Sequence, residues 1–409
     1  RPGREVGHAG AFREMPEKID RQIDVPLPRN GKGVCCCPKC RCQLLKVEQL
    51  RRIVEDILPS ERLVECYNTE QGYCPKCEKV VESRAAEQPP AADIHCPQIG
   101  VNALAMSAVL QTVYRLPFDL IVQLLTDMSG LTLSKSAVAR QMQRMGKRME
   151  EMTRLFGVRI KLSDAAHMDE TSWRVDGKNR WLWTLLNKQY TLFHVDKSRG
   201  AQVVKTLLGE VYGGTLHTDF YSAYGEIDCR KQKCLVHLLR ELERVAKYKD
   251  HGGDWPAFSK KLKRLIRDAI RLRKSKEERD AATYQRRCER MEKRLRLILA
   301  QGWSNKEAQR LLKRLNRHQD ELLTFLYRAD VPFENNFGER SIRGAVIMRK
   351  NSFNNRSEKG ASTQSVLMSV FFTIKQRGLN PVDTVKEALK IYLKTGNLPQ
   401  LKEFTASNG

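Results

Sequence analysis

The tetrapeptide Cys-Pro-Lys-Cys occurs twice near the start of the chain, at residues 37–40 and 74–77. Each copy is a CxxC knuckle, in which two thiolates can point at one metal ion, and two knuckles complete a tetrahedral site. The pair predicts a structural zinc ion, and reduced thiols without a metal are the alternative. The predicted ligands are Cys37, Cys40, Cys74 and Cys77. The neighbouring cysteines that compete for places in this set are Cys35, Cys36, Cys42 and Cys66.

The positions of the cysteines indicate the redox environment in which the protein folds. Nine of the 12 cysteines lie before residue 97. A secreted disulfide scaffold would be shorter and would spread them more evenly, so a reducing cytoplasm with a metal site is favoured. No apolar run reaches the roughly eighteen residues of a membrane span, and no signal peptide opens the chain, so we expect no membrane partner. The chain begins at Arg1 rather than Met, as a trimmed or partial sequence would.

The charge balance favours a polyanionic partner. Lys and Arg number 73 against 48 Asp and Glu, which gives a net charge of +25 and a sequence pI near 9.7. Nucleic acid is the expected partner, and a basic protein kept soluble by its charge is the alternative. About half of the excess lies in residues 256–328, where Lys and Arg outnumber Asp and Glu by more than two to one. A one-sided excess of this size favours a binding face over a merely solvated one.

Changes of composition along the chain predict successive segments. In order these are a basic flexible arm (1–33), a zinc-binding segment (34–84), a linker (85–97), a helical segment (98–156), the first part of an α/β core (157–235), a basic helical insertion (236–328), the second part of the core (329–395) and a tail (396–409).

The helical segment resembles a helix-turn-helix in its spacing. Helices are predicted over 118–127 and 134–149, with Gly130 in the turn and Ser134 as N-cap. Arg140 and Arg144 could then face a DNA groove, although any pair of packed helices would have the same pattern. One apolar stripe at helical spacing is made by Val138, Met142, Met145, Met149 and Met152.

After residue 157 the composition becomes typical of β-strands. Aromatic and β-branched residues predict strands over 173–175, 180–186, 189–195 and 214–218, with a helix over 200–208 before the last of them. Asp176-Gly177 is a strong hairpin-turn signal. The order favours a mixed-sheet α/β domain. Late helical stretches are predicted over 334–343 and 361–376.

Two acids follow predicted strands. Asp169 follows the apolar stretch 165–168, and Asp219 follows the strand 214–218. If these strands are neighbours, about 4.8 Å apart, both carboxylates emerge at one edge and repel unless a cation lies between them. Mg²⁺, an oxygen-seeking ion, is the natural occupant. Glu339, on a late helix, could complete a two-metal site that acts on a phosphodiester, and Glu334 is a rival third acid.

The residues around these acids carry a resemblance. The motifs HMDET (167–171), TDFYSAY (218–224) and NNFGER (335–340) occur in order and are followed by RKN (349–351). Together they resemble transposases of the insertion sequence 66 family, over the chain from the zinc knuckles to about residue 393. Because Arg340 follows Glu339 as the motif requires, the resemblance favours Glu339 over Glu334.

The resemblance implies an RNase H-like mixed-sheet catalytic core interrupted by the α-helical insertion, with an N-terminal zinc-ribbon-like segment and a helical DNA-binding segment. Its Asp-Asp-Glu triad would be Asp169, Asp219 and Glu339, holding two Mg²⁺ or Mn²⁺ ions. A protein of this kind would cut double-stranded DNA at transposon terminal inverted repeats and join the ends to target DNA. The resemblance also implies a homodimer on DNA and a place in the prokaryotic cytoplasm, associated with the nucleoid. The alternative is a domesticated, inactive DNA-binding protein.

Further residues receive roles from the same resemblance. Cys234 and His237 form a Cys-x-x-His element that follows the second acid in related transposases, and we expect it to support the structure, with or without a metal. Basic residues near the motifs are expected to hold phosphates: Lys197, Arg199, Arg340, Arg343, Arg349 and Lys350.

Overall fold

The computed structural model of the chain divides into two compact units, Arg1–Leu58 and Pro59–Gly409. It describes residues 18–19, 21–45, 47–48, 53, 61–66, 68, 70–82, 99–248, 251–352 and 355–401. The predicted linker 85–97, most of the predicted arm before residue 21 and the end of the predicted tail lie outside the described residues. No helix in the described ranges is both long enough and apolar enough to cross a bilayer.

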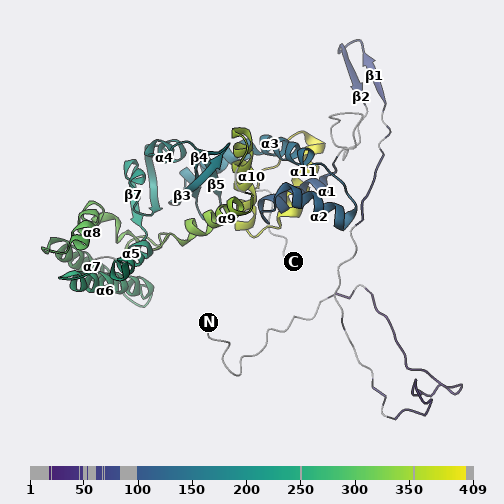
Figure 1. Cartoon of the computed structure of the whole chain (residues 1–409), viewed down its shortest axis with the longest axis horizontal. Helices are drawn as coiled ribbons and strands as arrows, with labels where there is room; N and C mark the ends of the chain where they lie inside the picture. The colour runs from purple at the N-terminus through teal and green to yellow at the C-terminus, as the bar shows by residue number, and fades with distance from the viewer. Residues whose placement is uncertain are drawn as a thin grey trace. The chain divides into compact units, whose positions relative to one another are not determined.

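A mixed sheet of five strands forms the centre of the second unit (Figure 1). Its strand order is β5-β4-β3-β6-β7, in which β3, β4 and β5 pair antiparallel and β3, β6 and β7 pair parallel. The strands are β3 (Ala165–Val175), β4 (Lys178–Leu186), β5 (Thr191–Asp196), β6 (Val211–Thr218) and β7 (Asp228–Lys233). A separate hairpin pairs β1 (Gln71–Cys74) with β2 (Lys79–Glu82).

Helices surround and interrupt this sheet. The helices before and within its first part are α1 (Val101–Thr112), α2 (Phe118–Ser129), α3 (Lys135–Lys161), α4 (Ala201–Leu208) and the 3₁₀ turn η1 (Ser222–Glu226). Those that follow it are α5 (Leu235–Tyr248), α6 (Trp255–Lys274), α7 (Ala281–Ala300), α8 (Lys306–Arg317), η2 (Gln319–Glu321), η3 (Thr324–Leu326), α9 (Asn336–Ser352), α10 (Glu358–Gln376) and α11 (Pro381–Thr395). The predicted mixed α/β architecture is confirmed at this level.

Alternation along the strands gives the sheet two apolar faces. On one face Ala166, Met168 and Trp183 pack with residues of α3, α4 and η1. On the other face Trp173 and Val175 pack with residues of α9 and α10. Asp169 has the parity of Trp173 and Val175, so it belongs to the α9 side, whereas the next residue belongs to the α4 side.

The predicted pair of helices around Gly130 is present. Gly130 ends α2 with φ 68°, and the Ser134 side chain accepts a hydrogen bond from the Ala137 N–H at 3.1 Å as the predicted N-cap. However, α3 is 27 residues long, and its predicted methionine stripe is buried in a core that it shares with α1, α10 and α11. Arg140 and Arg144 lie on its exposed face.

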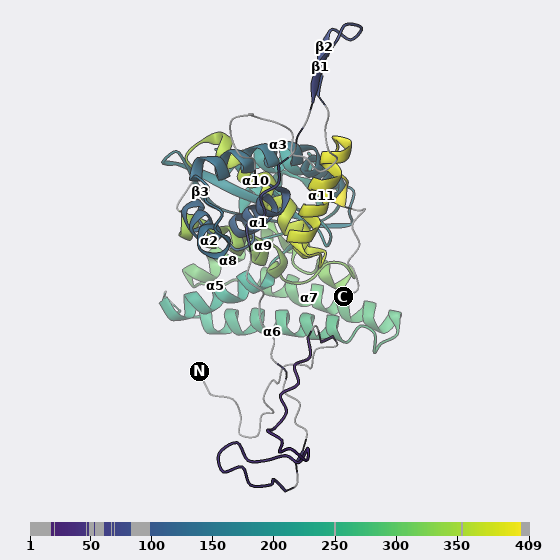
Figure 2. The ribbon, with the colours of Figure 1, turned by 90° about the vertical axis from the view of Figure 1, so that its right-hand side faces the viewer.

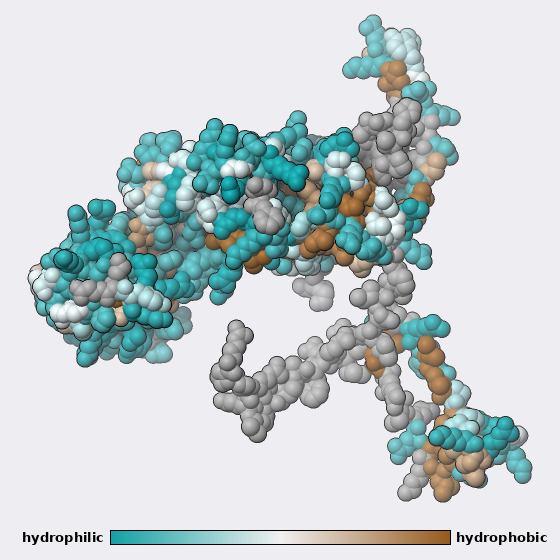
Figure 3. Space-filling view, in the orientation of Figure 1, coloured by the Kyte–Doolittle hydropathy of each residue, from teal (hydrophilic) through white to brown (hydrophobic). Residues whose placement is uncertain are grey.

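The insertion between β7 and α9 has a hydrophobic core of its own. The core is built from α5 to α8 and the two 3₁₀ turns, and it includes Trp255, Phe258 and Trp303. Phe258 contacts both tryptophan rings, with centroids 5.7 and 5.2 Å apart. The long helices α6 and α7 pack side by side (Figure 2), and the outer surface of the insertion is largely hydrophilic (Figure 3).

The secondary structure differs from the prediction at three places. The stretches predicted separately as 165–168 and 173–175 form one continuous strand, β3, whose hairpin turn is Asp176-Gly177 as predicted. The edge strand β7 was not predicted, because its sequence DCRKQK is polar. In the fold Lys231, Gln232 and Lys233 are buried, and each has hydrogen-bond partners. The helix α11 was not predicted as a separate element.

Candidate functional site

The first two predicted acids lie on neighbouring parallel strands, although Asp169 lies within β3 rather than after its end, because β3 continues to Val175. β3 and β6 pair in parallel, with His167 opposite His217. Carried two residues further, this register sets Asp169 opposite Asp219, which directly follows β6. Neighbouring strands lie about 4.8 Å apart, so the two residues lie side by side where β6 ends. The structure therefore brings these two predicted site residues together.

The third predicted acid comes from the first turn of α9. Glu339 lies in that turn, and α9 packs against β3 on the face to which Asp169 belongs. The charge of Glu339 is one of those that raise the pKa of Asp169. The rival acid, Glu334, lies before α9 begins. Residues separated by 170 positions in the sequence are thus gathered at one place.

Asp169 lies in surroundings that disfavour its charge. Burial, together with the charges of Glu170, Asp219 and Glu339, raises the pKa of Asp169 to about 8. One hydrogen bond, donated by the Glu170 N–H to Asp169 Oδ1 at 2.9 Å, acts in the opposite direction. Acids gathered in this way repel one another unless a cation lies between them. Their carboxylate oxygens are the ligands that Mg²⁺ and Mn²⁺ prefer, so the residues fit a site for such ions.

Glu170 belongs to the opposite face of the sheet and is paired there. Its side chain is 2% exposed, and it accepts a hydrogen bond from the Tyr224 hydroxyl and two from Arg199, at 3.1 and 2.7 Å. The guanidinium group also lies over the rings of Trp181 and Tyr221, 4.4 and 4.1 Å from their centroids. Burial raises the pKa of Glu170. Arg199, predicted to hold a phosphate, is therefore already engaged in an internal ion pair.

A buried network attaches the segment before α9 to the sheet. Asn335 Nδ2 donates to the Met168 carbonyl at 3.1 Å, and its Oδ1 accepts from His167 Nδ1 at 2.8 Å. His167 stacks on His217 with ring centroids 4.8 Å apart, and His217 Nε2 donates to the Pro332 carbonyl. Burial lowers the pKa of His167 to about 4 and that of His217 to about 3, so both rings are neutral near pH 7. These bonds fix the start of the helix that carries the third acid.

Sequence patterns alone assign no role to these network residues. The available signal was their place within the motifs, because His167 opens HMDET and Asn335 opens NNFGER. Gly338 in the second motif has a related explanation. A Cβ atom there would lie 2.9 Å from Asn335 Oδ1, so a larger residue would displace the amide from the network.

Glu339 also faces a second group of potential ligands. Cys234 Sγ, a ring nitrogen of His237 and a carboxylate oxygen of Glu339 all lie within 4.8 Å of one another. No other set of three such side chains is this close in the part of the chain that the structure describes. The buried Cys234 directly precedes α5, its sulfur accepts a hydrogen bond from the Asn335 N–H at 3.2 Å, and burial raises the pKa of the thiol. Arg240 donates a long hydrogen bond to Glu339 Oε2, at 3.4 Å.

The two predicted zinc knuckles have the same local backbone. In the first, Arg41 N–H donates to the Cys37 carbonyl at 2.9 Å, and Arg41 has φ 60°. In the second, Cys74 ends β1, and Glu78 after the knuckle has φ 52°. Hydrogen bonds from the last two residues of each knuckle lower the pKa of Cys37 and that of Cys74. The knuckles belong to the two different units, and zinc binding by them stays a prediction.

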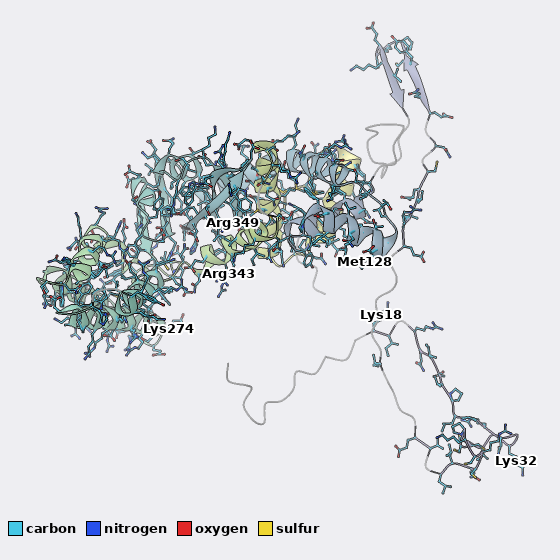
Figure 4. All side chains as sticks on the ribbon, in the orientation of Figure 1. Lys18, Lys32, Met128, Lys274, Arg343 and Arg349 are labelled. Atoms are coloured by element: carbon cyan, nitrogen blue, oxygen red, sulfur yellow. The ribbon has the colours of Figure 1, made fainter. Side chains whose placement is uncertain are left out.

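The remaining predicted phosphate contacts divide into engaged and exposed residues. Arg349, labelled in Figure 4, is engaged. Its Nη1 donates to the Ser172 carbonyl and hydroxyl and to Thr171 Oγ1, which attaches α9 to β3. The exposed ones are Arg140, Arg144, Lys197, Arg340, Arg343 and Lys350.

A larger basic surface lies on the insertion. Six basic residues of α6 recur at helical spacing over about 21 Å and share one face, which we call the α6 stripe. They are Lys260, Lys263, Arg264, Arg267, Arg271 and Lys274. Most of the stripe lines a groove of 590 Å³ beside Trp255 and Ser259. Asp268 lies 4.0 Å from Arg264 and 3.5 Å from Arg271, and within the described ranges the other four form no ion pair.

Comparison with known proteins identifies the family. Residues 97–363 match the transposase IS66 family, which is more than half of the chain, and the chain belongs to that family. The uncharacterized protein y4qI of Sinorhizobium fredii (strain NBRC 101917 / NGR234) is 25% identical over 293 residues, 64% of this chain and 53% of that protein. From the same strain, the uncharacterized protein y4jO is 33% identical over 88 residues, 22% of this chain and 27% of that protein. The chain spans about half the length of the first relative.

Proposed function

We propose that this chain is an active DNA transposase whose catalytic residues are Asp169, Asp219 and Glu339. The observation that carries the proposal is the parallel register of β3 and β6, which sets the two aspartates side by side next to the helix that supplies the glutamate. Family membership supports the same role. The raised pKa of Asp169 supports a cation site, because burial and the neighbouring carboxylates both disfavour its charged form unless a cation offsets that charge.

The reaction would proceed in two steps at one site. Water attacks the phosphodiester at the element end, the bond from phosphorus to the 3′ oxygen breaks, and a free 3′-hydroxyl remains. That hydroxyl then attacks a phosphodiester of the target and displaces the 3′ oxygen of the target strand, which leaves as a 3′-hydroxyl, so the element end is joined to the 5′ side of the target cut. Two Mg²⁺ or Mn²⁺ ions, held by the three carboxylates, would supply the charge that stabilises the attacking and leaving oxygens.

The protein itself would orient the carboxylates. The Glu170 N–H fixes one oxygen of Asp169, and the network from His167 through Asn335 fixes the start of α9 relative to β3. Arg199 and Tyr224 bind the Glu170 side chain on the far face, so its charge is partly offset there. Orientation of this kind lowers the barrier, because the ligands do not have to reorganise during the reaction.

An RNase H-like core is the finer fold that we propose. Three antiparallel strands are followed by a helix and two parallel strands, and the order places β3 at the centre with the first acid on it. The helical insertion enters after β7 and returns at α9, so the core would be completed from two parts of the chain.

Double-stranded DNA at transposon terminal inverted repeats and at the target is the partner that we propose. The net charge of +25 and the α6 stripe favour a duplex, whose backbone offers one phosphate for every ~1.7 Å of axis. Arg140, Arg144, Arg343 and Lys350 are candidates for further phosphate contacts. Structural zinc on the knuckles, a homodimer on DNA and a place at the nucleoid belong to the same proposal.

The test is metal-dependent nicking of labelled element ends by Asp169→Asn. We expect a loss of about three orders of magnitude in rate, because the charge that holds the ions is reduced, with DNA binding largely retained. Asp176→Asn is the matched control, since Asp176 is exposed in the turn at the far end of the same strand and Asn tolerates its φ of 51°. Full nicking by Asp169→Asn would rule out the assigned role. The domesticated DNA-binding alternative predicts no nicking by the unaltered chain.

A further inference from the structure

Two helices begin at the same place beside the acid cluster. Cys234 directly precedes α5, His237 lies in the first turn of α5, and Glu339 lies in the first turn of α9. The Leu235 N–H donates to the Phe333 carbonyl at 2.9 Å and the Asn335 N–H donates to Cys234 Sγ at 3.2 Å, so the two helix starts are joined. Sulfur, nitrogen and oxygen donors converge there within 4.8 Å.

The central pair of atoms is too far apart for a hydrogen bond. His237 Nδ1 and Glu339 Oε1 are 3.6 Å apart, and both atoms are buried with no hydrogen-bond partner among the residues that the structure describes. Buried polar atoms nearly always have a hydrogen-bond partner, so two facing atoms that both lack one need an explanation. Bonds of 2.0–2.2 Å to zinc at a tetrahedral angle would set nitrogen and oxygen ligands about 3.4 Å apart. The observed separation therefore suits an ion between the atoms better than direct contact.

The donor set selects the type of ion. A thiolate and an imidazole are soft or borderline ligands, which favour Zn²⁺ and related metals over Mg²⁺. Three protein ligands leave the fourth tetrahedral position for water. Burial raises the pKa of the Cys234 thiol, and the Val236 and His237 N–H groups at the start of α5 act in the opposite direction, so metal binding there would release the thiol proton. The adjacent Asp169 and Asp219 offer only oxygen, so the two groups of ligands prefer different cations.

We propose that Cys234, His237 and Glu339 bind a zinc-class ion, and that this ion competes with the catalytic cations for Glu339. A glutamate that completes the sulfur and nitrogen ligands is withdrawn from the aspartate pair, so Zn²⁺ acts as an inhibitor of Mg²⁺-dependent cleavage. The binding site stands by itself, whereas its regulatory effect rests on the proposed function.

Cobalt binding to the full-length chain tests the site without any assay of activity. Co²⁺ replaces Zn²⁺ and gives a thiolate-to-metal absorption band. We expect Cys234→Ser to lose one bound equivalent of Co²⁺ and part of this band relative to the unaltered chain, with the cobalt at the N-terminal knuckles retained. Cys229→Ser, which removes a half-buried thiol of β7, is the matched control and should change neither. An identical stoichiometry and spectrum for Cys234→Ser would overturn the site.

His237→Gln keeps the test decisive if Cys234→Ser does not fold. The His237 side chain is 39% exposed, so its replacement leaves the core of the insertion intact. The same loss of one Co²⁺ equivalent is expected, and retention of that equivalent in a folded variant would overturn the site.

Zn²⁺ titrated into Mg²⁺-dependent nicking tests the competition. In the unaltered chain we expect inhibition that requires more Zn²⁺ as Mg²⁺ is raised. His237→Gln should need at least tenfold more Zn²⁺ for half inhibition, relative to its own uninhibited rate. Equal sensitivity of the two chains would overturn the competition. Cys234-dependent cobalt binding without any nicking would contradict the proposed function and support the metal site. Nicking without Cys234-dependent cobalt binding would contradict the metal site and support the proposed function.

Discussion

The acid cluster beside the end of β6 and the α6 stripe each gather charge of one sign, but they differ in their surroundings. Asp169 is half-buried among other carboxyl groups, and its pKa rises to about 8. The α6 stripe lies along a mostly exposed helix face above a separate apolar core, where water screens its charges. Figure 4 labels Lys274 at one end of this stripe.

The difference teaches what each region can bind. Repulsion in the buried cluster is relieved only by a small cation that fits among the carboxylates. An extended row of solvated cations has no such requirement and matches an extended polyanion. The acid cluster therefore suits catalysis with bound cations, and the α6 stripe suits affinity for DNA. Variants in the two regions should separate the rate of nicking from the strength of DNA binding.

The largest expected effect comes from a matched pair of glutamates. Glu339→Gln should lower the rate of metal-dependent nicking by about two to three orders of magnitude, because one charged ligand of the cations is lost. Glu334→Gln, which alters the rival acid before α9, should leave the rate within about threefold. Nicking rates at saturating DNA measure both. Equal losses in the two variants would break the assignment of the third acid.

The buried cluster should also make stability depend on pH. Without divalent cations, the folded chain keeps the Asp169 proton up to pH ~8, whereas the unfolded chain loses it near 3.8. The contribution of this group to stability is therefore full below pH ~4 and is lost as pH rises toward 8. We expect the free energy of unfolding to decrease by several kcal/mol over that range, since each unit of pKa difference corresponds to about 1.4 kcal/mol.

Asp169→Asn isolates this effect. The variant should lack that part of the pH dependence and be more stable than the unaltered chain near pH 7 in a chelator. Asp176→Asn, exposed in the turn, should follow the unaltered chain. Denaturant unfolding at several pH values gives the comparison, and parallel curves for Asp169→Asn and the unaltered chain would contradict the electrostatic account of the cluster.

The α6 stripe should affect affinity and not chemistry. Replacing Lys260, Arg267 and Lys274 by Ala should flatten the log–log salt dependence of DNA binding by up to ~2.7 and weaken binding about tenfold, with the rate at saturating DNA unchanged. Replacing Arg286, Arg290 and Lys293 of α7 removes the same charge from another exposed face and is the control. If both triple variants have the same slope, net charge rather than the stripe determines binding.

The smallest effect is expected at Arg199. Arg199→Lys keeps the charge beside Glu170 but loses the two-nitrogen contact and the stacking on Trp181 and Tyr221. We expect nicking to slow by about threefold, because Glu170 and the adjacent acid are held less firmly. Arg174→Lys on the same sheet is the control, since Arg174 is exposed and its side chain donates to the Gly177 carbonyl. A larger loss of DNA affinity than of rate would restore Arg199 as a phosphate contact.

Local sequence patterns determined several turns, helix starts and buried helix faces of this protein. Asp176-Gly177 specifies the turn between β3 and β4, because both residues adopt positive φ. The stripe from Val138 to Met152 specifies a buried helix, and Ser134 specifies its start. The placement of two acids after apolar strand segments predicted that they would meet if the strands were neighbours. Each of these features depends on residues close in sequence.

Contacts between distant segments were decided only by the tertiary structure. The polar strand β7 is buried because partners from elsewhere satisfy it, as when Gln232 donates to the Leu322 carbonyl. Arg199 and Arg349 turn inward for the same reason, since Glu170 and β3 supply their partners. Glu339 faces both the aspartate pair and the Cys234–His237 pair, because the return of the chain after the insertion brings α9 to the start of α5. Local sequence specifies turns, caps and apolar faces, whereas the partner of a polar side chain depends on which segments the whole fold brings together.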